Sequence, residues 1–119
     1  QYVELTDPCS ETLNGYVHSA IENGLFCIVD TVFEEGWFSK FDDKMNVVKP
    51  IYIKIFCPLD VLKEREIQRD DRRIGTAEGQ FYKAHEGINY DLELDTSKLS
   101  PEESVSKIVE FITNNSKRD

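Results

Sequence analysis

Four of the five arginines in the chain lie within nine residues, in a protein whose formal net charge is −9. Arg65, Arg69 and Arg72 recur at spacings of four and three, so one helical face can present all three. Guanidinium groups bind phosphate oxygens bidentately and stabilise the charge on a phosphoryl group during transfer. Gly75 and Thr76 follow and suit a flexible loop that closes over a nucleotide. The cluster indicates a phosphate site; the alternative is a solvated surface paired with neighbouring acids.

Asp30 is the second candidate for chemistry, because it ends the apolar run Leu25-Phe26-Cys27-Ile28-Val29. Such a run predicts a strand that is buried on both faces. Desolvating a carboxylate at the end of that strand is costly unless the carboxylate has a role. In phosphate-binding enzymes an acid at this position helps to bind Mg²⁺. The alternative is that Asp30 caps the following turn.

A third stretch reads His85-Glu86-Gly87-Ile88-Asn89-Tyr90-Asp91 and is followed by Asp95-Thr96. A lone histidine in such a place is more often a structural hydrogen-bonding group than a catalytic base. Asp91 can cap a turn. Asp95 and Thr96 close a predicted strand, where ligands of parallel sheets collect.

The elements that must position these residues alternate between helix and strand. We predict helices at 11–23, 59–70, 78–85 and from Ser100 onward, and strands at 25–30, 51–57 and 90–95. Residues 33–45 form an irregular or helical crossover. This order predicts an α/β fold with a mainly parallel sheet.

The local signals at the helix ends are specific. Ser10 or Asp7 can cap the first helix, and Gly24 can stop it. Ser100, followed by a proline and a capping-box glutamate, begins the last helix. The buried stripe of that helix is predicted to contain Val105, Ile108, Val109 and Ile112.

Composition excludes several classes of function. The negative charge argues against a nucleic-acid surface, and no apolar run is long enough to span a membrane. Cys9, Cys27 and Cys57 show no metal-ligand spacing. Cys27 and Cys57 stand in apolar runs, so we expect reduced, buried thiols in a cytoplasmic protein.

From Tyr52 to Ile112 the order of motifs resembles the chloramphenicol phosphotransferase family. The matching pieces are the strand ending at Cys57, then Arg65-Glu66, Arg69-x-Asp71-Arg72 with Gly75 and Ala77, then His85-Glu86-Gly87-x-x-Tyr90-Asp91 and Asp95-Thr96. Upstream, Ile28-Val29-Asp30-Thr31-Val32-Phe33 resembles the third strand of that family. Thr31 replaces the second of two acids that usually stand there, so only one acid of that pair is present.

The resemblance implies a P-loop kinase with a three-layer α/β/α fold, which phosphorylates a small-molecule hydroxyl with ATP and Mg²⁺. By position, Arg69 and Arg72 would be catalytic lid arginines on the phosphates, with Arg65 nearby on the nucleotide. Asp30 would be the catalytic acid beside the metal. Thr96 would lie near the adenine. Phe33 and Trp37 are placed, by position and aromatic character, at the acceptor site.

One expected motif is missing. No Gly-x-x-x-x-Gly-Lys-Ser/Thr sequence occurs in residues 1–119. We therefore expect a single domain that is the C-terminal portion of the kinase fold, without its first two strands, and inactive alone. An upstream segment, or a second copy in a homo-oligomer, would complete the sheet. The alternatives are a non-catalytic binding or regulatory module, or a P-loop kinase of the shikimate, gluconate or adenylylsulfate type.

Overall fold

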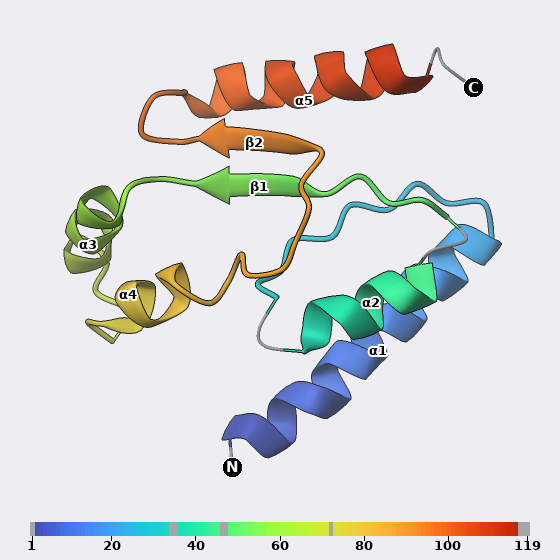
Figure 1. Ribbon diagram of the computed structural model, residues 1–119, viewed down its shortest axis with the longest axis horizontal. Helices are drawn as coiled ribbons and strands as arrows, with labels where there is room; N and C mark the ends of the chain where they lie inside the picture. The colour runs from blue at the N-terminus through green and yellow to red at the C-terminus, as the bar shows by residue number, and fades with distance from the viewer. Residues whose placement is uncertain (1, 34–35, 46–47, 72, 117–119) are drawn as a thin grey trace. The chain divides into compact units, whose positions relative to one another are not determined.

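The computed structural model describes residues 2–33, 36–45, 48–71 and 73–116 (Figure 1). The chain divides into two compact units, residues 1–50 and residues 51–119, called here the N-terminal and C-terminal units. Each is described by itself. The prediction that residues 1–119 form one domain stays a prediction.

The N-terminal unit consists of two packed helices, α1 (Tyr2–Glu22) and α2 (Trp37–Met45). Its interior contains Val17, Phe41 and Met45, which are 5%, 4% and 1% exposed. The prediction that α1 begins after Ser10 is wrong: Ser10 lies inside the helix and is only 6% exposed. Its side chain is therefore part of the packed interior and does not cap an exposed helix end.

The strand predicted at 25–30 is not formed. Gly24 ends α1 with a φ of +75°, as predicted, and the chain then continues without regular structure to Phe33. Phe26 and Ile28 are 79% and 85% exposed, and Cys27 is exposed rather than buried. The physical reason is that a strand requires a hydrogen-bonded neighbour. Within the described residues, the only paired strands lie elsewhere in the chain.

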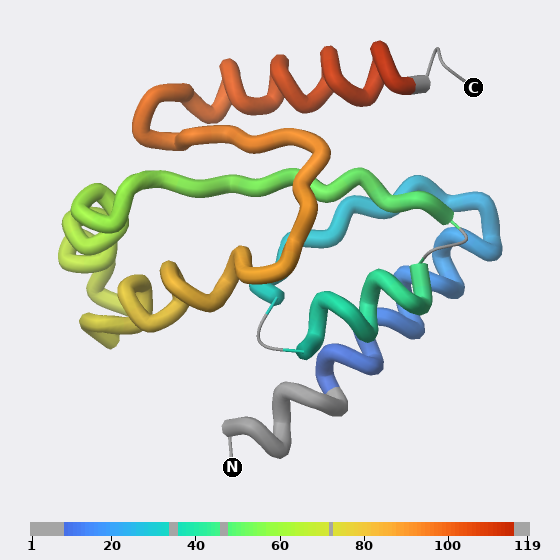
Figure 2. Tube along the Cα trace, in the orientation of Figure 1, coloured from blue at the N-terminus to red at the C-terminus, as the bar shows by residue number. Residues whose placement is uncertain are grey.

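The C-terminal unit contains a parallel pair of strands with helices between and after them (Figures 1 and 2). Its elements are β1 (Ile53–Phe56), α3 (Leu59–Ile67), α4 (Thr76–Phe81), β2 (Leu92–Asp95) and α5 (Pro101–Ser116). Helices combined with parallel strands confirm the predicted α/β class. The strands and the last helix lie within the predicted ranges, and both middle helices are shorter than predicted.

The register of the two strands is fixed at both ends. Ile53 lies opposite Leu92, and Phe56 lies opposite Asp95. At the start of the pair, the Asp91 carboxylate accepts a hydrogen bond from the Tyr52 amide at 2.7 Å, while the Asp91 amide donates to the Tyr52 carbonyl at 2.8 Å. The Asp91 carboxylate thus joins two neighbouring chain segments and does not cap the local turn that the sequence had suggested.

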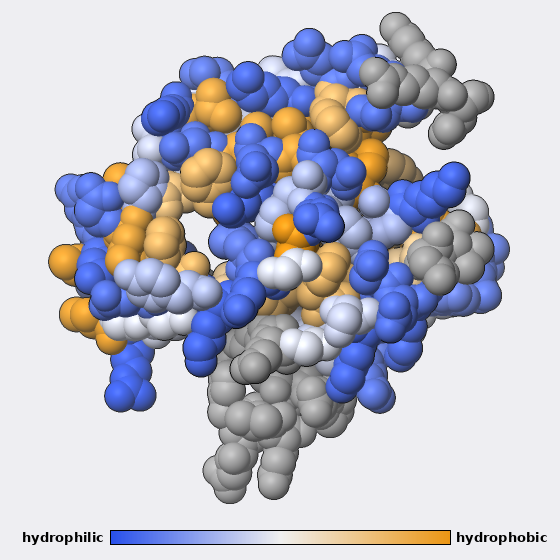
Figure 3. Space-filling view, viewed as in Figure 1, coloured by the Kyte–Doolittle hydropathy of each residue, from blue (hydrophilic) through white to orange (hydrophobic). Residues whose placement is uncertain are grey.

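The predicted N-terminal cap of the last helix is confirmed, but the predicted buried stripe is only partly so. The Glu103 amide donates to the Ser100 hydroxyl at 3.1 Å. Val105 and Val109, however, are 59% and 57% exposed. The sheet that α5 packs on has two strands among the described residues, so it covers only part of the apolar face of the helix. Figure 3 shows the resulting apolar surface over this part of the molecule.

Candidate functional site

The carboxyl ends of β1 and β2 meet where the sequence places its ligand edge. Thr96 directly follows β2, and its amide donates to the Phe56 carbonyl at 2.8 Å. After Phe56 the chain continues through Cys57, which is only 2% exposed, to Pro58, which precedes α3. The Asp95 carboxylate accepts hydrogen bonds from both the hydroxyl and the amide of Ser97, two residues later. These bonds hold the pKa of Asp95 below its usual value.

Arg65 joins helix α3 to this edge. Its Nη1 atom donates to Thr96 Oγ1 and its Nη2 atom to the Thr96 carbonyl, both at 2.9 Å. Nη1 also lies 3.7 Å from the Cys57 sulfur. The structure thus brings together two of the predicted nucleotide-binding residues. Arg65 uses its guanidinium to hold the segment after β2, while its role toward a nucleotide stays a prediction.

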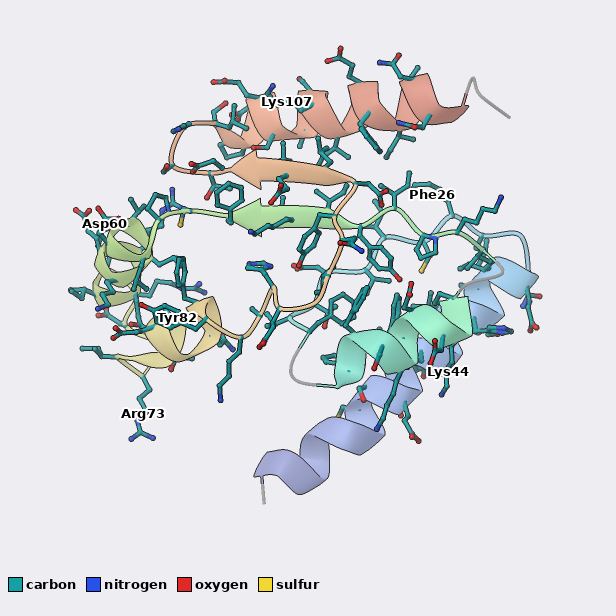
Figure 4. All side chains as sticks on the ribbon, viewed as in Figure 1. Phe26, Lys44, Asp60, Arg73, Tyr82 and Lys107 are labelled. Atoms are coloured by element: carbon teal, nitrogen blue, oxygen red, sulfur yellow. The ribbon has the colours of Figure 1, made fainter. Side chains whose placement is uncertain are left out.

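The arginine loop, defined as residues 68–75, does not continue the helical face predicted for it. Helix α3 ends at Ile67, so Arg69 lies beyond the helix that carries Arg65. Arg69 is 54% exposed and lies 3.3 Å from the Asp71 carboxylate. Arg73 is exposed and extends away from α3 and α4 (Figure 4). Arg72 lies outside the described residues.

Glu66 connects the end of α3 to the start of α4, and sequence reasoning gave it no role of its own. The side chain is only 5% exposed. One carboxylate oxygen accepts a hydrogen bond from the Gly75 amide at 3.0 Å, and the other accepts one from the Ala77 amide at 2.9 Å. These bonds return the chain to α3 and direct it into α4. The one signal in the sequence was Gly75, nine residues later, because glycine allows a sharp change of direction. In the structure its φ is +98°.

The His85–Asp91 stretch is a structural connection within the C-terminal unit. The Nδ1 atom of His85 lies 2.7 Å from the Tyr90 hydroxyl, and the two rings contact each other edge to face. Burial lowers the pKa of His85, and the positive charge of Lys54 lowers it further, against an opposing effect of Glu93. This supports the structural reading of the histidine.

The lowered pKa of His85 predicts a pH dependence of stability. In the unfolded chain His85 titrates near 6.5. As the pH falls, His85 is therefore protonated at a higher pH in the unfolded chain than in the folded protein, where its pKa is lowered. The free energy of unfolding therefore falls as pH falls below 6.5. Because His85 is partly exposed, we expect a loss below about 1 kcal/mol. Urea unfolding above and below this pH measures the loss in the free energy of unfolding. His85→Gln should show a smaller loss than the unaltered protein. An equal loss would assign the effect to other groups.

The residues predicted for metal and acceptor lie in the N-terminal unit. Asp30 is exposed and follows the irregular apolar segment. Phe33 lies at the centre of an aromatic cluster, with ring centroids 5.7 Å from Trp37, 5.3 Å from Phe38 and 5.3 Å from Phe41. The indole nitrogen of Trp37 is buried without a hydrogen-bond partner among the described residues. The structure therefore brings Phe33 and Trp37 together, while their role at an acceptor site stays a prediction.

Two broader properties concern the described part of the chain. No described helix has both the length and the apolar character that crossing a membrane requires. No group of three or more His, Cys, Asp or Glu side chains that could hold a metal ion is found in the described ranges. Asp30 as a metal ligand stays a prediction.

Comparison with known proteins identifies a family. Residues 4–113 match the model of the family described as chloramphenicol phosphotransferase-like protein. No curated protein and no solved structure matches the chain. The matched range includes the arginine loop, the His85–Asp91 stretch and the aromatic cluster.

Proposed function

Because the chain belongs to the chloramphenicol phosphotransferase-like family, we propose that it forms part of an ATP-dependent kinase that phosphorylates a hydroxyl group of a small molecule. In this reaction the bond between the γ-phosphorus and the oxygen that bridges it to the β-phosphorus breaks, and ADP leaves with that oxygen. The acceptor oxygen forms a bond to the γ-phosphorus and loses its proton. The observation that carries the proposal is Arg65, which binds Thr96 at the carboxyl ends of two parallel strands and lies on the helix that leads into the arginine loop, within a family of phosphotransferases. Arginine forks at that edge suit the phosphates of a nucleotide.

The roles of individual residues follow from their positions. Arg69 and Arg72 would contact the phosphates as lid residues, and Thr96, held by Arg65, would lie near the base of the nucleotide. An exposed arginine whose partner is an exposed acid can exchange that partner for a phosphate at little cost, since exposed ion pairs contribute about 1 kcal/mol or less. Arg69 and Asp71 form such a pair.

Asp30 fits a magnesium site of the kind found in kinases. Mg²⁺ is usually bound by one or two carboxylates together with substrate phosphates and water, so no dedicated cluster of protein ligands is required. A single accessible carboxylate at Asp30 meets this requirement. The metal would neutralise charge on the phosphates, and Asp30 would hold it, directly or through water.

The aromatic cluster is the proposed acceptor site. Phe33 and Trp37 offer an apolar surface, and the buried indole N–H of Trp37 has no partner among the described residues. A buried donor without a partner is costly, so a ligand oxygen that accepted this hydrogen bond would be favoured. This chemistry suits a small acceptor with an apolar part and an oxygen.

We further propose that residues upstream of Gln1 supply the phosphate-binding loop and complete the sheet. The motif is absent from residues 1–119, and β1 pairs only with β2 among the described residues. The mainly apolar segment at 25–30 has no regular structure and no strand partner among the described residues. A second copy of the chain is the other way to cover these edges.

Calorimetry with ATP and Mg²⁺ tests the proposed function. The titration compares residues 1–119 with a chain extended upstream through the phosphate-binding loop. We expect binding only by the extended chain, because the loop supplies the backbone cradle and the lysine for the phosphates. A screen of hydroxyl-bearing acceptors would then follow.

Absence of binding by both chains would favour the second candidate, a non-catalytic binding or regulatory module. The missing phosphate-binding motif is the observation that keeps this candidate in view.

A further inference from the structure

A single residue, Glu66, holds both ends of the segment that carries the arginines. The Arg69 amide donates to the Glu66 backbone carbonyl at 3.1 Å, and the Gly75 amide donates to the Glu66 side chain at 3.0 Å. The Arg69 amide and the Gly75 amide are thus held by the backbone and the carboxylate of the same residue. Closing a loop in this way reduces the number of conformations open to the residues inside it.

The Glu66 carboxylate is buried, so water could not take over its hydrogen bonds if the carboxylate were removed. Glu66 is 5% exposed, and each of its two oxygens accepts one backbone amide. Hydrogen bonds to a charged acceptor are roughly twice as strong as neutral ones, and a buried charge requires such partners. Both donors, Gly75 and Ala77, stand at the start of α4, where helix amides have no partner within the helix.

We propose that Glu66 is a positioning residue for the arginine loop: its carboxylate fixes the loop that presents Arg69 to the phosphates of ATP. This inference rests on the proposed function. Glu66 itself does not touch the nucleotide. It determines whether the guanidinium of Arg69 is held in place before ATP binds or must be ordered during binding, which would weaken affinity.

Glu66→Gln is the informative substitution, because it preserves the size of the side chain and one acceptor oxygen. The amide group that replaces the second oxygen would face a backbone N–H, so one of the two bonds is lost. Glu66→Ala removes both. Glu64→Gln is the matched control, since Glu64 lies on the same helix, is exposed and undergoes the same chemical change.

The first readout is independent of ATP. Limited trypsin digestion is followed by mass spectrometry for fragments that begin after Arg69 and Arg73. We expect cleavage there to be about 10-fold faster in Glu66→Gln and faster still in Glu66→Ala, because the bonds to a charged acceptor no longer oppose opening of the loop. Glu64→Gln should match the unaltered protein. Equal cleavage rates in all four proteins would overturn the proposal.

The second readout is the affinity for ATP and Mg²⁺, measured by calorimetry on the chain extended upstream. We expect about 10-fold weaker binding by Glu66→Gln, with a thermal unfolding curve close to that of the control. Faster cleavage with unchanged ATP affinity would overturn the positioning role. If the unaltered extended protein bound no ATP, the proposed function would fail, whereas the digestion would still show whether Glu66 orders the loop.

Discussion

Arg69→Ala is expected to weaken ATP binding by about 10- to 100-fold in the chain extended upstream, since a hydrogen bond to a charged group contributes roughly 1.5–3 kcal/mol. Turnover should fall at least as much if the guanidinium also stabilises the transferring phosphoryl group. Stability should hardly change. Arg69 is 54% exposed and its pair with Asp71 lies at the surface, where such pairs contribute little.

Two variants make this measurement specific. Arg69→Lys retains the charge but not the planar fork, so we expect an intermediate affinity. Lys83→Ala removes another exposed positive charge from the C-terminal unit and should leave ATP affinity unchanged. Calorimetry gives the affinity and a coupled assay gives turnover. Wild-type values for Arg69→Ala would place Arg69 on the solvated surface, as the alternative interpretation of the cluster has it.

Leu94→Ala is expected to lower the free energy of unfolding of the C-terminal unit by about 2–5 kcal/mol, the range for large-to-small changes at fully buried positions. Leu94 is 1% exposed and lies in β2 opposite Ile55. Few side chains of this unit are buried so completely; Cys57 is another. The loss of a single one should therefore remove a large fraction of its stability.

Val109→Ala provides the control, because Val109 is also aliphatic but is 57% exposed on α5. Its effect should stay within about 0.5 kcal/mol. Urea unfolding followed by circular dichroism compares the two variants. Similar losses would mean that the outer face of α5 is covered in solution, by a second copy or another partner.

The sequence predicted best those elements whose signals are local. The Ser100 cap and the run after it specified α5, and the capped end of α1 at Gly24 was found as well. The alternation of residues 90–95 identified β2. Each of these signals depends on neighbours within about one turn or one strand, which a single sequence displays.

The failures have a common physical origin in contacts between distant residues. The apolar run at 25–30 predicted a buried strand, but a strand forms only if a neighbour is available to pair with it. The predicted helical face of Arg65 and Arg69 is not formed, because α3 ends at Ile67, and the Glu66 carboxylate binds amides nine and eleven residues later. Neither effect is visible in periodicity.

The candidate site was predicted in its components rather than in its arrangement. Arg65 and Thr96 were each chosen as nucleotide ligands, and the structure joins them directly. Their separation by 31 positions explains why the sequence could not show it. The contact between Phe33 and Trp37 is local by comparison, because the two residues are four positions apart.

The parallel arrangement of β1 and β2 has a consequence for the order in which the protein is made and folds. Parallel neighbours require a long connection, and here residues 57–91 form it and include the arginine loop (Figure 2). At about 5–20 residues per second, β2 is synthesised one to several seconds after the arginines. During that interval Arg65 has no Thr96 to hold. This edge of the sheet can thus form only after β2 has been made, and a nascent chain that stops before residue 92 would carry every arginine of the cluster without the Thr96 that holds Arg65.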